Sequence, residues 1–130
     1  MTLFGHPLFS SERFYHIESL EAIAKTPSNS IVALFFAPQN IDIIVHLRNN
    51  KIRFALYVTS TTEAVLAENM NANYLIVHPK VGQEIQKVAD HYMFDAKVLG
   101  YIDQEDQLEK LIDIRLDGAI FIEAIVKITS

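Results

Sequence analysis

The segment from Phe54 to Pro79, FALYVTSTTEAVLAENMNANYLIVHP, decides the fold because it contains a strand, a helix and a second strand in succession. Apolar runs predict strands over 53–59 and 74–77, since strands buried on both faces of a parallel sheet are continuously apolar. Between them, Ser60 and Glu63 have the spacing of a capping box, which marks the start of a helix. The segment therefore predicts one βα unit followed by the strand of the next.

The same unit recurs along most of the chain. Apolar runs begin near residues 31, 53, 74, 97 and 119, a period of about 20–23 residues. Each period holds a strand and an amphipathic helix, as in a barrel or a doubly wound sheet, whereas the asparagine ladder of a leucine-rich solenoid is absent. We therefore predict an α/β fold whose five- to six-stranded, mostly parallel sheet forms a partial TIM barrel. A flavodoxin-like doubly wound sheet is the alternative.

The chain length of 130 residues predicts a single domain spanning 1–130. Residues 1–12 are the least patterned part, and we expect them to form a less regular N-terminal arm. A half-barrel has two exposed sheet edges, which proteins normally cover. Self-association through an edge, the arm or the C-terminal residues is the natural solution, so we predict a homo-oligomer, a dimer or higher.

Composition excludes several classes of function. The net charge of −5, from 16 acidic and 11 basic residues, argues against a nucleic-acid partner and against an anionic membrane surface. The absence of cysteine excludes disulfides, zinc–thiolate sites and cysteine nucleophiles. The N-terminal residues lack the basic region of a secretory signal, and no apolar run approaches the ~20 residues that span a bilayer. We expect a soluble, cytoplasmic protein without a cofactor.

Three stretches resemble the class I aldolases that cleave 2-keto-3-deoxy-phosphogluconate, which are Schiff-base-forming (β/α)8 barrels. These stretches are VTSTTEAVLAENMNANYLIVHP, VGQEIQKVADHYMFDAKVLGYI and LDGAIFIEA, and the resemblance covers about half of the chain, from about Phe54 to Phe121. In that family they run through the middle barrel strands to the strand that carries the catalytic lysine. The resemblance implies a barrel-derived fold.

The residues that this family uses for catalysis are missing at the matched positions. Its Schiff-base lysine falls at Ile120, and isoleucine has no nucleophile. Its catalytic glutamate falls within Leu34–Phe36, which is wholly apolar. The last two barrel strands, whose loops usually hold the substrate phosphate, have no counterpart in these residues. The resemblance therefore implies a truncated, degenerate barrel without the parent chemistry.

Functional residues of parallel α/β folds lie where strands end and helices begin. His78, Asp103 and Glu123 follow three successive predicted strands, where they could act as acid and base or hold a divalent metal. Helix capping is the competing explanation for such residues, and it is the commoner role. The other strand ends supply candidate ligand-binding groups, which are Gln39, Thr59, Ser60 and Tyr101.

Two functional hypotheses follow. The first is a non-catalytic, barrel-derived protein that acts as an oligomeric small-molecule-binding or regulatory and interaction protein. The alternative is a small lyase or isomerase that acts on an oxo-acid or sugar-like substrate through His78, Asp103 and Glu123. A receiver-like signalling domain fits less well, because the strand ends FFAPQ and IVHPK lack its acidic cluster and its phospho-accepting aspartate.

Overall fold

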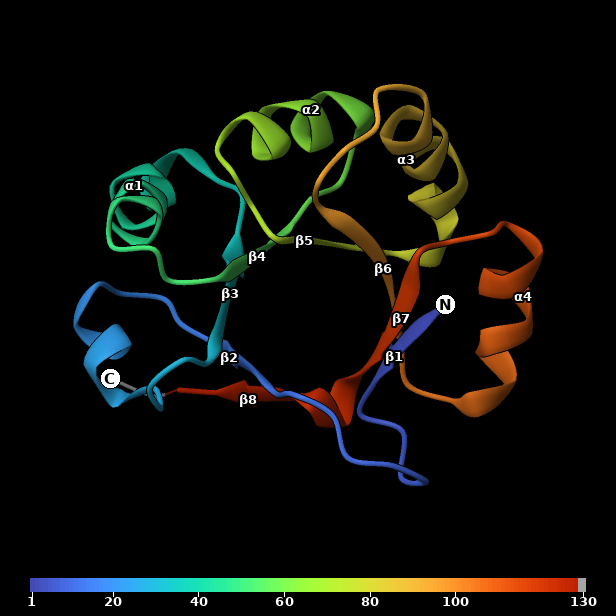
Figure 1. The fold of residues 1–130 in the computed structure, drawn as a ribbon, viewed down its shortest axis with the longest axis horizontal. Helices are drawn as coiled ribbons and strands as arrows, with labels where there is room; N and C mark the ends of the chain where they lie inside the picture. Colours follow the sequence, from blue (N-terminus) through green and yellow to red (C-terminus); the bar gives the residue numbers. More distant parts are fainter. Residues whose placement is uncertain (129–130) are drawn as a thin grey trace.

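The computed structural model describes residues 1–128, and its strands form one all-parallel sheet that curls through 263° as a half-barrel (Figure 1). The strands are β1 (Thr2–Phe4), β2 (Phe14–His16), β3 (Ile31–Phe35), β4 (Phe54–Tyr57), β5 (Tyr74–Val77), β6 (Lys97–Ile102), β7 (Gly118–Phe121) and β8 (Ile125–Lys127). Their order in the sheet is β1-β7-β6-β5-β4-β3-β2-β8. Because β2 to β7 follow one another in chain order, the doubly wound alternative, which requires a switch point, is excluded.

Figure 1 shows the α-helices outside the ring of strands, where they cover the outer face of the sheet. The helices are α1 (Ile41–Asn49), α2 (Thr61–Asn69), α3 (Pro79–His91) and α4 (Leu108–Asp113), with 3-10 turns η1 (Glu21–Lys25), η2 (Pro38–Asn40), η3 (Glu105–Gln107) and η4 (Ile122–Ala124). Within residues 1–128, none of them has both the length and the apolar character to cross a bilayer.

The predicted partial barrel of βα units is confirmed, and it has eight strands where we predicted five or six. Strands β3 to β7 are the five that the apolar runs indicate, and β2, where the composition of residues 13–18 is typical of a strand, is the sixth. The two additional strands, β1 and β8, are three residues each and form the two edges of the sheet. Strand β1 lies inside the expected N-terminal arm, where it pairs with β7.

The period of the sequence corresponds to a recurring backbone turn at the end of each α-helix. In every case one residue adopts a left-handed conformation, and the amide of the next residue bonds to a carbonyl five residues back, as Ile52 does to Leu47 at 3.0 Å. This is the Schellman pattern, which satisfies the last carbonyls of a helix. The turns are about 20–22 residues apart, and their left-handed residues are Lys51, Asn71, Met93 and Arg115.

Alternation along the strands divides the apolar side chains into two layers. Outward side chains such as Leu34, Leu56 and Val98 are fully buried beneath the helices. Inward side chains fill the interior of the barrel below the ends of the strands that form its mouth, toward their amino ends. There the ring of Phe14 meets Phe4 edge-on at 4.9 Å and Tyr74 at 5.3 Å, measured between ring centroids. Burial on both faces explains why the strands read as continuous apolar runs.

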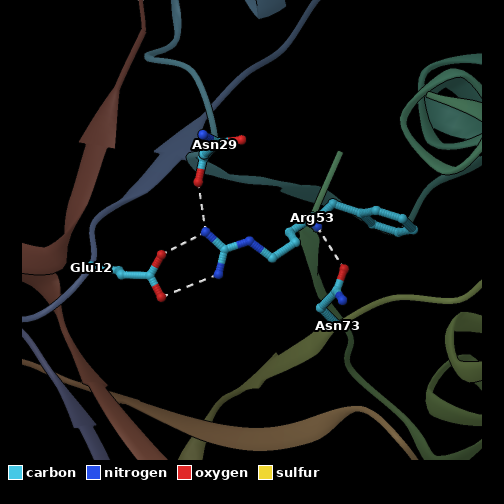
Figure 2. Close-up of polar contacts among 5 residues, drawn as sticks. Glu12, Asn29, Arg53 and Asn73 are labelled. Atoms are coloured by element: carbon cyan, nitrogen blue, oxygen red, sulfur yellow. Dashed lines mark hydrogen bonds and ion pairs between the residues drawn. The ribbon is translucent and has the colours of Figure 1, made fainter. Parts of the chain in front are cut away.

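Residues that precede the strands close the amino end of the barrel (Figure 2). The Arg53 guanidinium donates to both carboxylate oxygens of Glu12, at 3.2 and 2.6 Å, and to the backbone oxygen of Asn29 at 2.6 Å. The Asn73 side-chain oxygen accepts from the Phe54 amide at 3.0 Å. The hydrogen bond from Arg53 holds the pKa of Glu12 below its usual value. These contacts link the segments that enter β2, β3, β4 and β5.

Two connections cross the opening between the edge strands β1 and β8, namely the loop 5–13 and η4 (Figure 1). They are in close contact, because a Cβ atom on Gly5 would lie 3.0 Å from both the amide nitrogen and the Cβ of Ala124. Gly5 also has a φ of +89°, which favours glycine. The side chain of His6 packs edge-on against Phe121 at 5.5 Å. The opening of the half-barrel is thus partly covered by the chain itself.

Candidate functional site

A cavity of about 540 Å³ opens at the carboxyl ends of the strands, opposite the end that Arg53 closes. Its volume lies within the ~300–1,000 Å³ typical of small-molecule sites. The lining comes largely from inward-pointing residues near the ends of strands, which include His16, Phe35, Tyr57, Ile76, Tyr101 and Lys127. The curled sheet therefore places a largely apolar hollow where parallel α/β proteins bind their ligands.

Aromatic rings form one wall of this cavity. Phe35 and Tyr57 are register partners on β3 and β4, and their ring centroids are 4.7 Å apart. The ring of His16, from β2, lies 5.7 Å from each of them. Although it is a large apolar side chain, Phe35 is 55% exposed, since it projects into the open cavity. This wall offers ring faces and edges to a bound molecule.

The hydroxyl of Tyr57 is a donor directed at the cavity. It has no hydrogen-bond partner within residues 1–128, and no side-chain polar atom there is both fully buried and unpaired, so this hydroxyl is reached from the cavity. Burial raises the pKa of Tyr57, and the proximity of Tyr101 raises it further. Both effects favour the protonated phenol, which is the form that donates a hydrogen bond.

Two histidines line the cavity in different ways. His16 is 8% exposed, and its Nε2 lies 3.3 Å from a carboxylate oxygen of Glu18. His78 is the N-cap of α3, where its Nδ1 accepts a hydrogen bond from the Lys80 amide at 3.0 Å. Because Nδ1 is the acceptor, the neutral ring of His78 carries its proton on Nε2. The Nε2 of His78 is therefore a donor, whereas His16 is occupied with Glu18.

Lys127 supplies the only ammonium or guanidinium group among the residues that line the cavity. It is the register partner of His16 on the neighbouring strand. Within residues 1–128 its side chain makes no ion pair or hydrogen bond. The cavity thus has one unpaired cation at its edge strand.

Three of the residues proposed from the sequence line the cavity together, namely Thr59, His78 and Tyr101. The Thr59 hydroxyl donates to Glu63 at 3.1 Å, so it is already partnered. Ser60 caps α2 by accepting from the Glu63 amide at 3.1 Å, which confirms the predicted cap. The Glu63 carboxylate accepts from the Thr59 amide, whereas a capping box would pair it with the amide of Ser60.

Asp103, Glu123 and Gln39 are exposed and do not line the cavity. The predicted helix cap at Asp103 is wrong, because the amides of Asp103 and Gln104 both donate to the side chain of Gln107 at 2.8 Å. Glu123 lies in η4, and Gln39 lies in η2 beside a separate depression. Within the described residues no group of three or more histidine or acidic side chains has a metal-binding arrangement, so His78, Asp103 and Glu123 are not gathered as one.

Sequence reasoning missed Phe35, Tyr57, His16 and Lys127 as site residues. The first three stand at or near strand ends, and assigning the inward positions of each strand by alternation would have found them. Lys127 had no such signal, because β8 was not predicted.

No family model and no curated protein matches this chain. What the aldolase resemblance retains is the architecture, a half-barrel of βα units. Ile120, the position matched to the family's lysine, is fully buried in the lumen. Within the segment matched to the catalytic glutamate, Phe35 faces the cavity.

Proposed function

We propose that the chain is a non-catalytic, oligomeric protein that binds a small molecule in the mouth of its barrel. The observation that supports this most is the cavity of about 540 Å³, with aromatic walls and few polar groups, at the carboxyl ends of the strands. Sites for small molecules in proteins have this character, with a mostly apolar lining and a few placed polar groups. Descent from an aldolase-type barrel that has lost its catalytic lysine is part of the same proposal.

An acid–base enzyme, such as a lyase or isomerase on an oxo-acid or sugar-like substrate, is the second candidate. One observation favours it, namely the His16–Glu18 pair at 3.3 Å inside the cavity, since a carboxylate can orient and support a histidine base. The three groups that we expected to act together count against it, because only His78 lines the cavity. We therefore rank binding above catalysis.

Naphthalene-2-carboxamide, a flat neutral molecule, should bind to the cavity with a Kd of about 1 mM or tighter, from about −0.3 kcal/mol per non-hydrogen atom. Phe35→Ala should weaken this affinity by at least about fivefold, because it removes an exposed wall and the ring contact it offers. Saturation-transfer NMR and isothermal titration calorimetry measure both values.

Tyr92→Ala is the matched control, since Tyr92 is an exposed aromatic residue (68%) outside the cavity lining. It should leave the affinity unchanged. Absence of binding to the unaltered protein, or equal weakening by both variants, would contradict a site in the barrel mouth.

Association of copies through the opening between β1 and β8 is the second part of the proposal. Each of these edge strands pairs on one side only within residues 1–128, and Leu8 and Phe9 in the adjoining loop are 84% and 48% exposed. Analytical ultracentrifugation at micromolar concentration should show a dimer or higher oligomer. Leu8→Asp should shift it toward the monomer, whereas Met93→Asp, at an equally exposed apolar residue in the turn that follows α3, should not. If the unaltered protein were strictly monomeric, the proposed self-association would be wrong.

A further inference from the structure

We infer that the ligand of the barrel mouth is a flat aromatic carboxylate, with its ring against Phe35 and Tyr57 and its carboxylate on Lys127. The inference rests on the proposed function, because it concerns the same cavity. It adds the chemical class of the molecule and the residue that selects it.

The wall favours a planar, apolar group. Phe35 and Tyr57 are inclined by 35° with ring centroids 4.7 Å apart, and Ile76 and Val81 add aliphatic surface to the same cavity. An exposed phenylalanine at the end of a barrel strand costs hydrophobic free energy unless something covers it. A planar ring covers such a surface while losing little conformational entropy.

Every unpaired polar group of the lining can donate a hydrogen bond, and the tyrosine hydroxyls can also accept one. The ammonium of Lys127 and the hydroxyls of Tyr57 and Tyr101 have no hydrogen-bond partner within residues 1–128. The Nε2 of His78 is a donor as well, because Nδ1 is bonded to the Lys80 amide. The carboxylate of Glu18 is the one anionic acceptor of the lining, and it is paired with His16. A ligand that brings acceptors can therefore pair with all of them, Lys127 included.

Charge places those acceptors at β8. The protein carries a net charge of −5, so the single unpaired cation of the cavity is a local exception. Lys127 stands beside His16 in the sheet, and β2 is the one strand that separates β8 from β3, which carries Phe35. A carboxylate on an aromatic ring can thus reach Lys127 while the ring lies against Phe35. Glu18, whose carboxylate lies 3.3 Å from the neighbouring His16, partly opposes an anion there, so removing its charge should strengthen the binding of a carboxylate.

Naphthalene-2-carboxylate should bind at least about tenfold more tightly than naphthalene-2-carboxamide at pH 7.5, because a hydrogen bond to a charged partner is stronger than a neutral one. Lys127→Met should abolish this preference and leave the affinity for the carboxamide unchanged. Lys127→Arg should retain it, and Glu18→Gln should raise the affinity for the carboxylate alone. Lys87→Met, which removes the same charge from the exposed face of α3, is the control and should alter neither affinity. Isothermal titration calorimetry in 50 mM and 500 mM salt gives these values, and the preference should shrink at high salt.

The outcomes separate the inference from the function on which it rests. Equal affinity for the two molecules, or a preference that survives Lys127→Met, would show that Lys127 does not select a carboxylate. The proposed binding site itself would remain. Tighter binding of cyclohexanecarboxylate than of benzoate would contradict the inference that the ligand has a flat aromatic ring. Failure of every probe to bind overturns the proposed function itself. Because the Lys127 side chain is exposed, its substitution should not unfold the protein, and circular dichroism checks that it does not.

Discussion

Replacing Phe14 with alanine should lower the free energy of unfolding by about 3–5 kcal/mol. The side chain of Phe14 is fully buried at the centre of the lumen, where its ring makes edge contacts with Phe4 at 4.9 Å and Tyr74 at 5.3 Å. These three rings come from β2, β1 and β5, so they join strands that are distant in the sheet. Removing the middle ring leaves a cavity that the rigid strands cannot close. The loss of stability therefore exceeds the free energy of transferring the side chain from the core to water.

Phe9→Ala is the control for this prediction. Phe9 is 48% exposed in the loop between β1 and β2, so its removal should cost less than about 1 kcal/mol. Urea denaturation followed by circular dichroism measures both changes. A loss of less than about 1 kcal/mol for Phe14→Ala would mean that the lumen is not packed around this ring.

The interior strands were predictable because each carries its own signal. Continuous apolar runs such as Tyr74–Val77 reflect burial on both faces, and the period reflects the helix-ending turn at Lys51 and its equivalents. Strands β1 and β8 have no such signal. A three-residue segment such as Thr2–Phe4 becomes a strand only because β7 offers a free edge, so its structure is decided by tertiary pairing.

The candidate site, like the sheet, was predictable only in part. The rule that strand ends carry function found Thr59, His78 and Tyr101, which do line one cavity. Asp103 shows where the rule stops, because its main-chain amide is bonded by Gln107 and its side chain lies outside the cavity. Lys127 could not be predicted as a site residue, since its position depends on the pairing of β8 with β2.

Gly118→Ala should displace β1 and lower the free energy of unfolding by about 3 kcal/mol or more, through overpacking and the loss of buried Phe4. A Cβ atom at Gly118 would lie 2.4 Å from the carbonyl oxygen of Thr2 and 2.8 Å from a methyl group of Leu99. The first of these is backbone, so no change of rotamer relieves it. Since Thr2 pairs directly with Gly118, the clash is relieved only if β1 moves away from β7.

Two comparisons test this mechanism by urea denaturation. Gly82→Ala should be neutral or stabilising, because its new methyl meets only side-chain methyls of Leu116 and Ile114 at 3.2–3.4 Å, and alanine is favoured over glycine in helix α3 by about 1 kcal/mol. Phe4→Ala should cost about 3–5 kcal/mol in the unaltered protein and much less in the Gly118→Ala variant. The two losses overlap because Phe4 leaves the lumen with β1. If Phe4→Ala costs the same in both backgrounds, β1 has stayed in place, and the sheet accommodates the extra methyl in another way.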